Sequence, residues 1–277
     1  MRLADCRLLV TGASGGIGQA LVERLCDGGA RLLLVGRDRL ALEQLAERFP
    51  GQVETVCADL ADRADRQRVL IAVRQFEDFN GVISAAGINS FSLFEEQDEA
   101  SIERLISVNV TATLQLLRLL LPELRRAPRA LVINLGSTFG SLGYPGFAAY
   151  CASKFALRGF SEALRREMAD TAVRVLYIAP RATRTAMNAG PVVAMNDALG
   201  VAMDDPRQVA GQIARAIEAE REELYLGWPE RFFVFLNQLL PRLVDRALQR
   251  QLPVIRRFAR GAESALSSSS SSGDQHP

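Results

Sequence analysis

The sequence predicts an α/β protein built on a doubly wound parallel sheet of the Rossmann type, with helices on both faces. Two observations predict this fold. Short runs rich in Val, Leu and Ile alternate with amphipathic segments along most of the chain, and the first run leads directly into a glycine-rich turn at residues 11–18. Strands that alternate with helices form βαβ units with right-handed crossovers, which make the strands parallel. The 277 residues suffice for one such domain with a large core.

The predicted elements follow in order along the chain. Short apolar runs predict buried strands at residues 7–10, 31–35, 53–58, 81–84, 130–135 and 174–178, with one more at 224–226. Amphipathic periodicity predicts helices at residues 17–27, 39–48, 62–76, 99–121, 150–170 and 208–219. Residues 186–205 are small, apolar and interrupted by Gly and Pro, which fits either a mobile substrate flap or a plain surface loop. We assign residues 1–227 to this one domain.

The composition excludes several kinds of function. The formal net charge is +1, so no overall field attracts nucleic acid or an anionic membrane. The four cysteines include no CxxC pair, which indicates a reducing compartment, the cytoplasm, rather than disulfides or a zinc site. The only histidine, His276, lies in the terminal tail, which argues against a His-based triad and a His-ligated metal. We expect no metal.

The basic residues are unusually uneven. Lys154 is the single lysine among 33 lysines and arginines, and the rest are arginines. Coding bias can replace lysine with arginine wherever only a positive charge is needed. The position that keeps lysine is therefore a candidate for a role that needs a compact ammonium group, with chance as the simpler alternative.

A phosphate-binding turn is predicted after the first strand. Residues 11–18 read Thr-Gly-Ala-Ser-Gly-Gly-Ile-Gly and lead into a helix. Glycines let the backbone approach a pyrophosphate closely, and the free N–H groups and dipole of the helix N-terminus attract the anion. The candidate cofactor-binding residues in the turn are Gly12, Ser14, Gly15, Gly16, Ile17 and Gly18. The alternative is a tight strand–helix turn that binds no ligand.

The end of the second strand indicates which dinucleotide binds. A cofactor with a free ribose 2′-hydroxyl usually meets an acidic residue here, but this chain has Arg37 followed by Asp38. Arg37 suits a 2′-phosphate and favours NADP(H) over NAD(H). Alternatively, Arg37 is solvated and Asp38 turns toward the ribose. Asp59, after the third strand, could bind the adenine amino group or cap the next helix.

A serine, a tyrosine and the single lysine form the candidate catalytic group. Ser137 follows the strand at 130–135, and Tyr150 and Lys154 are spaced i,i+4, so they share one face of a helix. A tyrosine hydroxyl with a pKa near 10 is a poor base at neutral pH, and a nearby ammonium favours the phenolate and lowers that pKa. We therefore expect Lys154 to tune Tyr150 for proton transfer.

These motifs together resemble the short-chain dehydrogenase/reductase family over about two-thirds of the chain. The resemblance rests on residues 11–18, Asp59, Ala-Ala-Gly at 85–87, Asn109, Ser137, Tyr-Cys-Ala-Ser-Lys at 150–154 and residues 180–185. It implies that Tyr150 is the general acid in reduction and the base in oxidation, and that Ser137 polarises the substrate carbonyl. Lys154 would bind the ribose hydroxyls, and Asn109 would hold a water that links Lys154 to solvent.

The resemblance also implies further cofactor contacts. Beside Arg37, Asp59, Tyr150 and Lys154, they come from Leu60, Ala86, Gly87, Pro180, Thr183 and Thr185. Thr183 would meet the nicotinamide carboxamide through its backbone, and Thr185 would reach a phosphate. The chain departs from the family pattern at Ser84 and Ala85, where asparagines often brace the sheet. It departs again at Arg181, which replaces a glycine and could narrow the pocket or bind an anionic substrate group.

Residues 228–260 are predicted to form an amphipathic helical extension. Apolar residues recur at mainly i, i+3, i+4 and i+7, with breaks expected at Pro241 and Pro253 and arginines on the other face. This extension could pack on its own domain, pack on another subunit or lie on a membrane. Residues 261–277 contain a six-serine run and are predicted to be disordered.

The sequence thus predicts an NADP(H)-dependent oxidoreductase that transfers a hydride between a nicotinamide and a carbonyl/alcohol pair. The amphipathic extension favours a hydrophobic substrate, such as a 3-oxoacyl or long-chain ketone. A non-catalytic dinucleotide sensor on the same fold is the alternative. The resemblance implies a homodimer or homotetramer, because the helices that carry Asn109 and Tyr150 are subunit contacts in the family.

Overall fold

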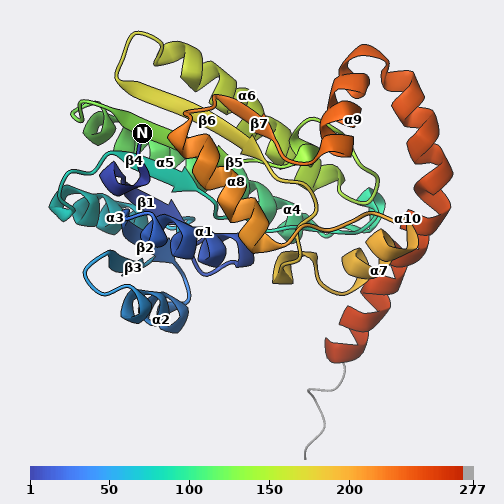
Figure 1. Ribbon diagram of the computed structural model, residues 1–277. Coiled ribbons are helices and arrows are strands. Elements are labelled where there is room, and N and C mark those ends of the chain that lie inside the picture. Colours follow the sequence, from blue (N-terminus) through green and yellow to red (C-terminus); the bar gives the residue numbers. More distant parts are fainter. Residues whose placement is uncertain (271–277) are drawn as a thin grey trace, which may run out of the picture.

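The computed structural model describes residues 1–270 and places them in a seven-stranded, all-parallel sheet covered by helices on both faces (Figure 1). The strand order is β3-β2-β1-β4-β5-β6-β7, and every neighbouring pair is parallel. The strands are β1 (Arg7–Thr11), β2 (Arg31–Gly36), β3 (Val53–Cys57), β4 (Gly81–Ser84), β5 (Ala130–Leu135), β6 (Val173–Ala179) and β7 (Glu223–Tyr225). The predicted Rossmann-like fold class is confirmed, and each predicted strand is present within about two residues.

The helices alternate with these strands as predicted. They are α1 (Gly16–Asp27), α2 (Arg39–Arg48), α3 (Arg63–Gln75), α4 (Glu99–Ile106), α5 (Ala112–Leu124), α6 (Ala148–Glu167), α7 (Pro191–Ala198), α8 (Pro206–Glu218), α9 (Trp228–Leu239) and α10 (Pro241–Ser270). The predicted helix at 99–121 consists of α4 and α5 joined by a π-helical turn at Ser107–Thr111. The segment 186–205, predicted as a loop or flap, contains α7. Pro191 begins that helix with a preset φ, which the sequence interpretation missed.

Successive side chains along each strand point to opposite faces of the sheet, which divides the core into two layers. Leu8 and Val10 of β1 belong to the cluster formed with α1 and α8, whereas Leu9 belongs to the cluster formed with α3, α5 and α6. This follows from the two-residue period of a strand, which sends successive side chains to opposite faces. A third cluster lies beside the carboxyl ends of the strands and includes Tyr150, α7 and Ile255 of α10.

One helical stretch is long and apolar enough to span a membrane by length and composition. It covers Glu99–Leu124, which is α4, the π turn and α5. Leu116, Leu117 and Leu120 of this stretch are buried in the core layer that covers the sheet. Its apolar character therefore has a sufficient explanation in the packing of this domain.

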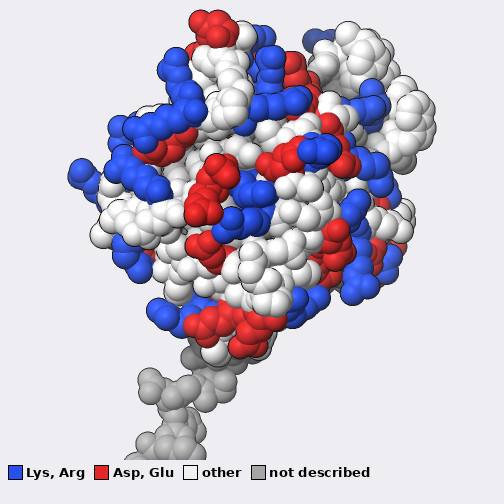
Figure 2. All heavy atoms as spheres, turned by 60° about the vertical axis from the view of Figure 1, so that its left-hand side comes forward, with Lys and Arg blue, Asp and Glu red and all other residues white. Residues whose placement is uncertain are grey.

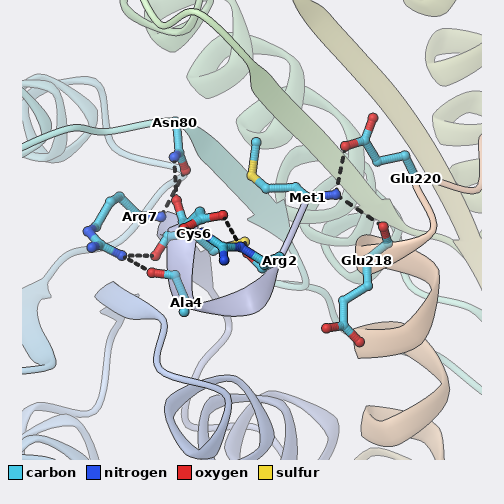
Figure 3. Close-up of polar contacts among 9 residues, drawn as sticks. Met1, Arg2, Ala4, Cys6, Arg7, Asn80, Glu218 and Glu220 are labelled. Atoms are coloured by element: carbon cyan, nitrogen blue, oxygen red, sulfur yellow. Dashed lines mark hydrogen bonds and ion pairs between the residues drawn. The ribbon is translucent and has the colours of Figure 1, made fainter.

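The N-terminal residues close the amino edge of the sheet (Figure 3). The ammonium of Met1 donates to the backbone carbonyl of Glu218 at 3.0 Å and to the carboxylate of Glu220 at 2.8 Å. Asn80 accepts from the backbone N–H of Arg7 at 2.8 Å. These contacts fix the edge opposite to the one that carries the candidate site.

Charges of both signs are interspersed on the face shown in Figure 2, which is the left-hand side of Figure 1. This face carries no continuous stripe of positive charge of the kind that follows a nucleic-acid backbone.

The C-terminal helices α9 and α10 pack on the same domain along its right-hand side in Figure 1. Val234 of α9 and Val244, Ile255 and Ala259 of α10 are buried. Four polar contacts add to this packing: Arg181–Glu230, Asn237–Ser141, Tyr144–Gln251 and Arg260–Glu96. The extension thus packs against its own domain in part and leaves the outer face of α9 exposed, and contact of that face with another subunit or a membrane stays a prediction.

Two details of the C-terminal prediction are corrected. The helical extension is interrupted at Leu240, before Pro241, as predicted. Pro253, where a second break was predicted, lies inside α10. Pro253 is exposed, so the carbonyl that loses its helical partner there faces water rather than the core. The helix continues to Ser270, into the range predicted to be disordered, and the remainder of that range, 271–277, lies outside the described residues.

Thr11 replaces the asparagine bracing that the sequence lacks at the end of β4. Its hydroxyl oxygen accepts from the backbone N–H groups of Ala85 and Ala86, both at 3.1 Å, and Thr11 itself is buried. The hydroxyl therefore joins β1 to the segment after β4, where the candidate site begins.

Replacing Thr11 with valine should destabilise the protein, because the isosteric side chain leaves two N–H groups without their acceptor. Unsatisfied buried donors cost about 1–3 kcal/mol each, so we expect a loss of at least about 1 kcal/mol in the free energy of unfolding. Urea titration followed by circular dichroism measures it. Thr11→Ser is the matched control, since it keeps the hydroxyl. Equal stability of the valine and serine variants would contradict the brace.

Candidate active site

A cavity of about 590 Å³ lies at the carboxyl ends of the central strands. The strand order reverses between β1 and β4, because β1 connects outward to β2 while β4 continues to the other side. In open α/β sheets this reversal creates the crevice where ligands bind. The cavity brings together most of the predicted site residues: Gly12, Gly15, Gly16, Ile17, Gly18, Gly87, Ser137, Tyr150, Lys154, Pro180 and Thr185.

The glycine turn is shaped to receive a phosphate. Gly12 has φ +67°, and a Cβ there would lie 2.7 Å from the backbone nitrogen of Ala86. A Cβ on Gly16 would lie 2.7 Å from the side chain of Thr185. Helix α1 begins at Gly16 after Gly15, whose missing side chain leaves the first N–H groups of the helix uncapped. The turn therefore offers free donors and the positive end of a helix dipole to an anion, so it fits the pyrophosphate of a dinucleotide.

The predicted contacts at the ends of β2 and β3 lie on the rim rather than in the cavity wall. Arg37 is exposed directly after β2, and the Ser14 hydroxyl lies next to Gly36. Asp38 caps α2 by accepting from the N–H of Ala41 at 3.1 Å. One oxygen of Asp38 is thus engaged in the helix cap, whereas Arg37 is exposed, and which of the two meets the ribose stays a prediction.

Asp59 and Leu60 follow β3 on the same rim. The Asp59 carboxylate accepts from the N–H of Ala61 at 2.9 Å, and the cap of α3 is Asp62 instead. The suggestion that Asp59 caps this helix is wrong, since the chain needs three more residues before it turns into α3. Leu60 is half-buried and its carbonyl accepts from Arg66, so it holds the rim in place.

Ser137, Tyr150 and Lys154 converge from two elements. Ser137 follows β5, where its hydroxyl accepts from the N–H of Phe139 at 3.1 Å. Tyr150 and Lys154 lie one turn apart in α6, and the Lys154 Nζ is 5.7 Å from the centroid of the Tyr150 ring. Lys154 also donates to the carbonyl of Leu135 at 3.3 Å. The shared helix face inferred from their spacing is present.

Burial controls the acidity of both groups. Desolvation raises the pKa of Tyr150 to about 12, partly offset by a side-chain hydrogen bond with Ser137. Desolvation also lowers the pKa of Lys154 to about 8, because the charged ammonium is the form that loses hydration. Desolvation is thus the largest influence on the Tyr150 pKa here, and the expected lowering of that pKa by Lys154 stays a prediction. The phenol is held in its protonated form.

Asn109 positions the site from the π turn between α4 and α5. It is 1% exposed, and its amide oxygen accepts from the N–H of Ile88 at 2.8 Å. Its amide nitrogen donates to the Ile88 carbonyl at 2.9 Å and to the Ser153 hydroxyl at 3.1 Å. The side chain therefore links the segment after β4 to α6, next to Gly87 and Lys154. π turns occur frequently at functional sites. This one places Asn109 between the segment after β4 and helix α6, which both carry candidate site residues.

The segment after β6 contains an ion-pair cluster that the sequence interpretation did not foresee. Arg181 lines the cavity and forms ion pairs with Asp204 and Glu230, and these hydrogen bonds raise its pKa. Thr183 is buried, its hydroxyl donates to the Arg181 carbonyl at 2.9 Å, and its own backbone carbonyl accepts from the Asn188 side chain at 3.0 Å. Arg181 therefore clamps this segment to α9.

The other half of the cavity is apolar and was largely missed from the sequence. It is lined by Phe139, Leu142, Tyr144, Phe147, Met187, Val192, Met195, Phe233, Val244 and Leu248. Residues of α7, α9 and α10 meet there, so the predicted flap does line the site and the C-terminal extension closes it. The signal that could have found α10 is the inward stripe Val244, Leu248, Gln251 and Ile255, which has helical spacing.

A second hollow of about 800 Å³ lies at the amino edge of the sheet, around Asn80 and Arg126. Of the four acidic residues that line it, Glu123 is paired with Arg74 and Arg126, and Asp5 is paired with Arg2. This hollow lies away from the glycine turn and brings none of the candidate groups together.

The fold and the site together define a dinucleotide-binding α/β oxidoreductase. Residues 7–193 match the short chain dehydrogenase family, and the chain belongs to that family. An uncharacterized oxidoreductase of Staphylococcus epidermidis is 32% identical over 183 residues, which cover 66% of this chain and 80% of the relative.

Solved structures share this architecture. A short-chain dehydrogenase from Streptomyces avermitilis superposes with a TM-score of 0.76 at 28% identity, covering 88% of this chain and 97% of that one. Two others, at 24% and 23% identity, share the fold alone: a Burkholderia cenocepacia short chain dehydrogenase in complex with NADP (TM-score 0.77, covering 90% and 99%) and a Brucella melitensis 3-ketoacyl-(acyl-carrier-protein) reductase with NADH (0.74, covering 81% and 97%).

The single lysine allows a direct test of the site electrostatics. In protein labelled with ¹³C-lysine, the one side-chain resonance should titrate with a midpoint of about 8, because burial favours the neutral amine. An activity that needs the ammonium should fall as pH rises through that midpoint. NMR titration measures it, and Lys154→Arg, which removes the signal, is the assignment control. A midpoint near 10.4, the value of a solvated lysine, would contradict the burial of this group.

Proposed function

We propose that this chain is an NADP(H)-dependent oxidoreductase that reduces a hydrophobic ketone or oxidises the corresponding alcohol. The observation that carries the proposal is one continuous cavity that runs from the glycine turn, past Ser137, Tyr150 and Lys154, into an apolar chamber. A dinucleotide at the turn and an apolar carbonyl compound in the chamber would meet at the phenol hydroxyl.

The residues present fit a nicotinamide dinucleotide. The turn at Gly12 and Gly16 would receive its pyrophosphate, Lys154 its nicotinamide ribose, and the backbone around Thr183 its carboxamide. When bound, this cofactor supplies or accepts the hydride. The remaining chemistry, which is orientation, proton transfer and exclusion of water, belongs to the protein.

Proton transfer falls to Tyr150. A phenol with a pKa raised to about 12 stays protonated at neutral pH and can donate to the oxygen of a carbonyl as negative charge develops on it. The hydroxyl of Ser137 would polarise the same oxygen. Lys154, with a pKa of about 8, is mostly charged at neutral pH and would stabilise the phenolate left behind. This arrangement favours the reductive direction.

The preference for NADP(H) rests on Arg37. Asp38 is occupied as a helix cap, so the free charged side chain at the end of β2 is a guanidinium, which pairs with phosphate through parallel N–H donors. A guanidinium at this position offers no acceptor to a ribose 2′-hydroxyl, whereas an acidic residue would.

The hydrophobic substrate is supported by the walls of the chamber. Phe139, Tyr144 and Phe147 stack on one another at centroid distances of 4.9 to 6.1 Å and form a rigid apolar surface beside Tyr150. Of the described residues, the charged ones that line the cavity are Lys154, Arg181 and Glu230, and the last two are paired with each other. A long-chain or acyl-type ketone matches this surface better than a charged metabolite.

We also propose a cytoplasmic homodimer or homotetramer. Helices α5 and α6 cover one face of the sheet, and Phe155 of α6 is 41% exposed there. The exposed ring of Phe155 would be covered if this face formed a subunit contact.

Tyr150→Phe should abolish turnover but not cofactor binding. Because general acid catalysis contributes about 10²–10⁴-fold, we expect a loss of that size in kcat/KM for ketone reduction. The assay follows NADPH oxidation with ketones of increasing chain length, and calorimetry with NADPH measures binding. If the parent binds NADPH but turns over no ketone, and the variant behaves identically, the chain is a sensor instead.

Arg37→Ala should raise the KM for NADPH by about 10–100-fold and leave the KM for NADH nearly unchanged. The reason is that a charge-assisted hydrogen bond to the 2′-phosphate contributes about 1.5–3 kcal/mol, and each 1.4 kcal/mol is tenfold. Steady-state kinetics with both cofactors measures this. Arg24→Ala, an exposed arginine of α1 away from the turn, is the matched control. A parallel change for the two cofactors would exclude the 2′-phosphate contact.

A further inference from the structure

We propose that the outer face of α9 and the start of α10 docks on the surface of an anionic lipid bilayer. This C-terminal apolar face consists of large side chains that are 43–78% exposed: Trp228, Phe232, Phe233, Phe235, Leu239, Leu240 and Leu243. Seven large apolar side chains exposed side by side are uncommon on a soluble monomer and mark an interaction surface.

Helical spacing keeps these side chains on the outside. Trp228, Phe232, Phe235 and Leu239 recur at intervals of four, three and four residues, so they form one stripe along α9. Val234 faces the domain and is 4% exposed. Helix α9 lies at the margin of the molecule, away from the sheet (Figure 1). The stripe therefore points away from the domain that the rest of the helix packs against.

Charge indicates what kind of partner covers this face. Residues 228–260 contain seven arginines and two acidic residues, in a chain whose net charge is +1. One of the acidic residues, Glu230, is already bound to Arg181. Arg246 and Arg250 are exposed and lie three and seven residues after Leu243, on the same side of α10. Aromatic and Leu side chains flanked by arginines suit the acyl boundary and the acidic headgroups of a bilayer.

A second copy of the chain suits this face less well. In a two-fold interface each patch meets itself, so the surplus of arginines would meet an equal surplus. Like charges opposed in this way are unfavourable, and of the two acidic residues in 228–260, Glu230 and Asp245, the first is already paired with Arg181.

The face also borders the cavity. Phe233 is 43% exposed and lines the cavity, and Val244, Leu248 and Gln251 of α10 line it too. An apolar ketone dissolved in the bilayer would thus have a short path to Tyr150. This consequence rests on the proposed function, whereas the docking itself does not.

Trp228 is the only tryptophan and lies in this face, so it reports docking directly. The full chain is mixed with phosphatidylcholine vesicles, with and without phosphatidylglycerol. We expect the Trp228 emission to shift to the blue and to be quenched by brominated acyl chains only when the anionic lipid is present, and the effect to weaken at high salt. An emission maximum that stays unchanged with both vesicles would overturn the proposal.

Variants separate this face from other surfaces. Phe232→Ser combined with Phe235→Ser should weaken binding to the anionic vesicles at least tenfold, since each exposed ring loses its burial in lipid. The matched control is Ile71→Ser on α3, which is 56% exposed on another surface and should bind as the parent does. Arg246→Gln combined with Arg250→Gln should reduce the preference for the anionic lipid and leave the fold intact.

The outcome is independent of catalysis, because vesicle sedimentation and Trp228 emission need neither cofactor nor turnover. A chain that docks but reduces no ketone would refute the proposed function and keep this inference. Light scattering tests whether a second copy of the chain covers this face instead. If the parent ignores vesicles and the Phe232/Phe235 double variant turns a dimer into a monomer, the face belongs to a second copy and the proposal is wrong.

Discussion

The burial of one ammonium beside one phenol is the interaction on which the site depends. Lys154 is 7% exposed, and among the described residues it has no carboxylate partner; the carbonyl of Leu135 accepts from it. A buried cation without a counter-ion is costly, and the cost appears as a pKa lowered to about 8. Such a group gains stability from any negative charge that forms nearby. Under the proposed function, the phenolate that forms at Tyr150 during proton transfer is such a charge.

The surrounding structure keeps Lys154 buried beside Tyr150 despite the desolvation cost of the ammonium. Helix α6 carries both Tyr150 and Lys154, and Asn109 ties α6 to the segment after β4 through Ser153 and Ile88. The Thr11 hydroxyl then ties that segment to β1 and the glycine turn. A chain of buried and partly buried hydrogen bonds thus connects the glycine turn to the helix that carries Tyr150. Because these groups have little access to water, misplacing one of them leaves its partner poorly satisfied, which favours a single geometry.

The sequence predicted the features that have local causes. Strand and helix periodicity, the glycine turn and the i,i+4 pair each depend on nearby residues, and each was found where predicted. The misses arise from contacts distant in sequence. Arg181 pairs with Asp204 and Glu230, which lie 23 and 49 residues away in the sequence. No local sequence pattern predicts those partners. The effect of burial on Tyr150 was also missed: the sequence pointed to its neighbour Lys154, whereas the packing of Phe139, Phe147 and α10 around Tyr150 raises its pKa by desolvation.

The retention of a single lysine follows from the same desolvation. At the surface of this chain the basic partners in ion pairs are arginines, as in the exposed pairs Arg2–Asp5, Arg68–Asp65 and Arg166–Glu162. In the cavity an arginine would be unsuitable, because a guanidinium keeps its proton at any accessible pH and presents a rigid planar fork that must satisfy five donors. An ammonium has three donors on a flexible stem, and burial can bring its pKa close to neutrality. The proposed role of this position requires a cation that can donate to one carbonyl, donate to a second acceptor and release its proton. Of the basic side chains with long stems, lysine alone meets all three requirements.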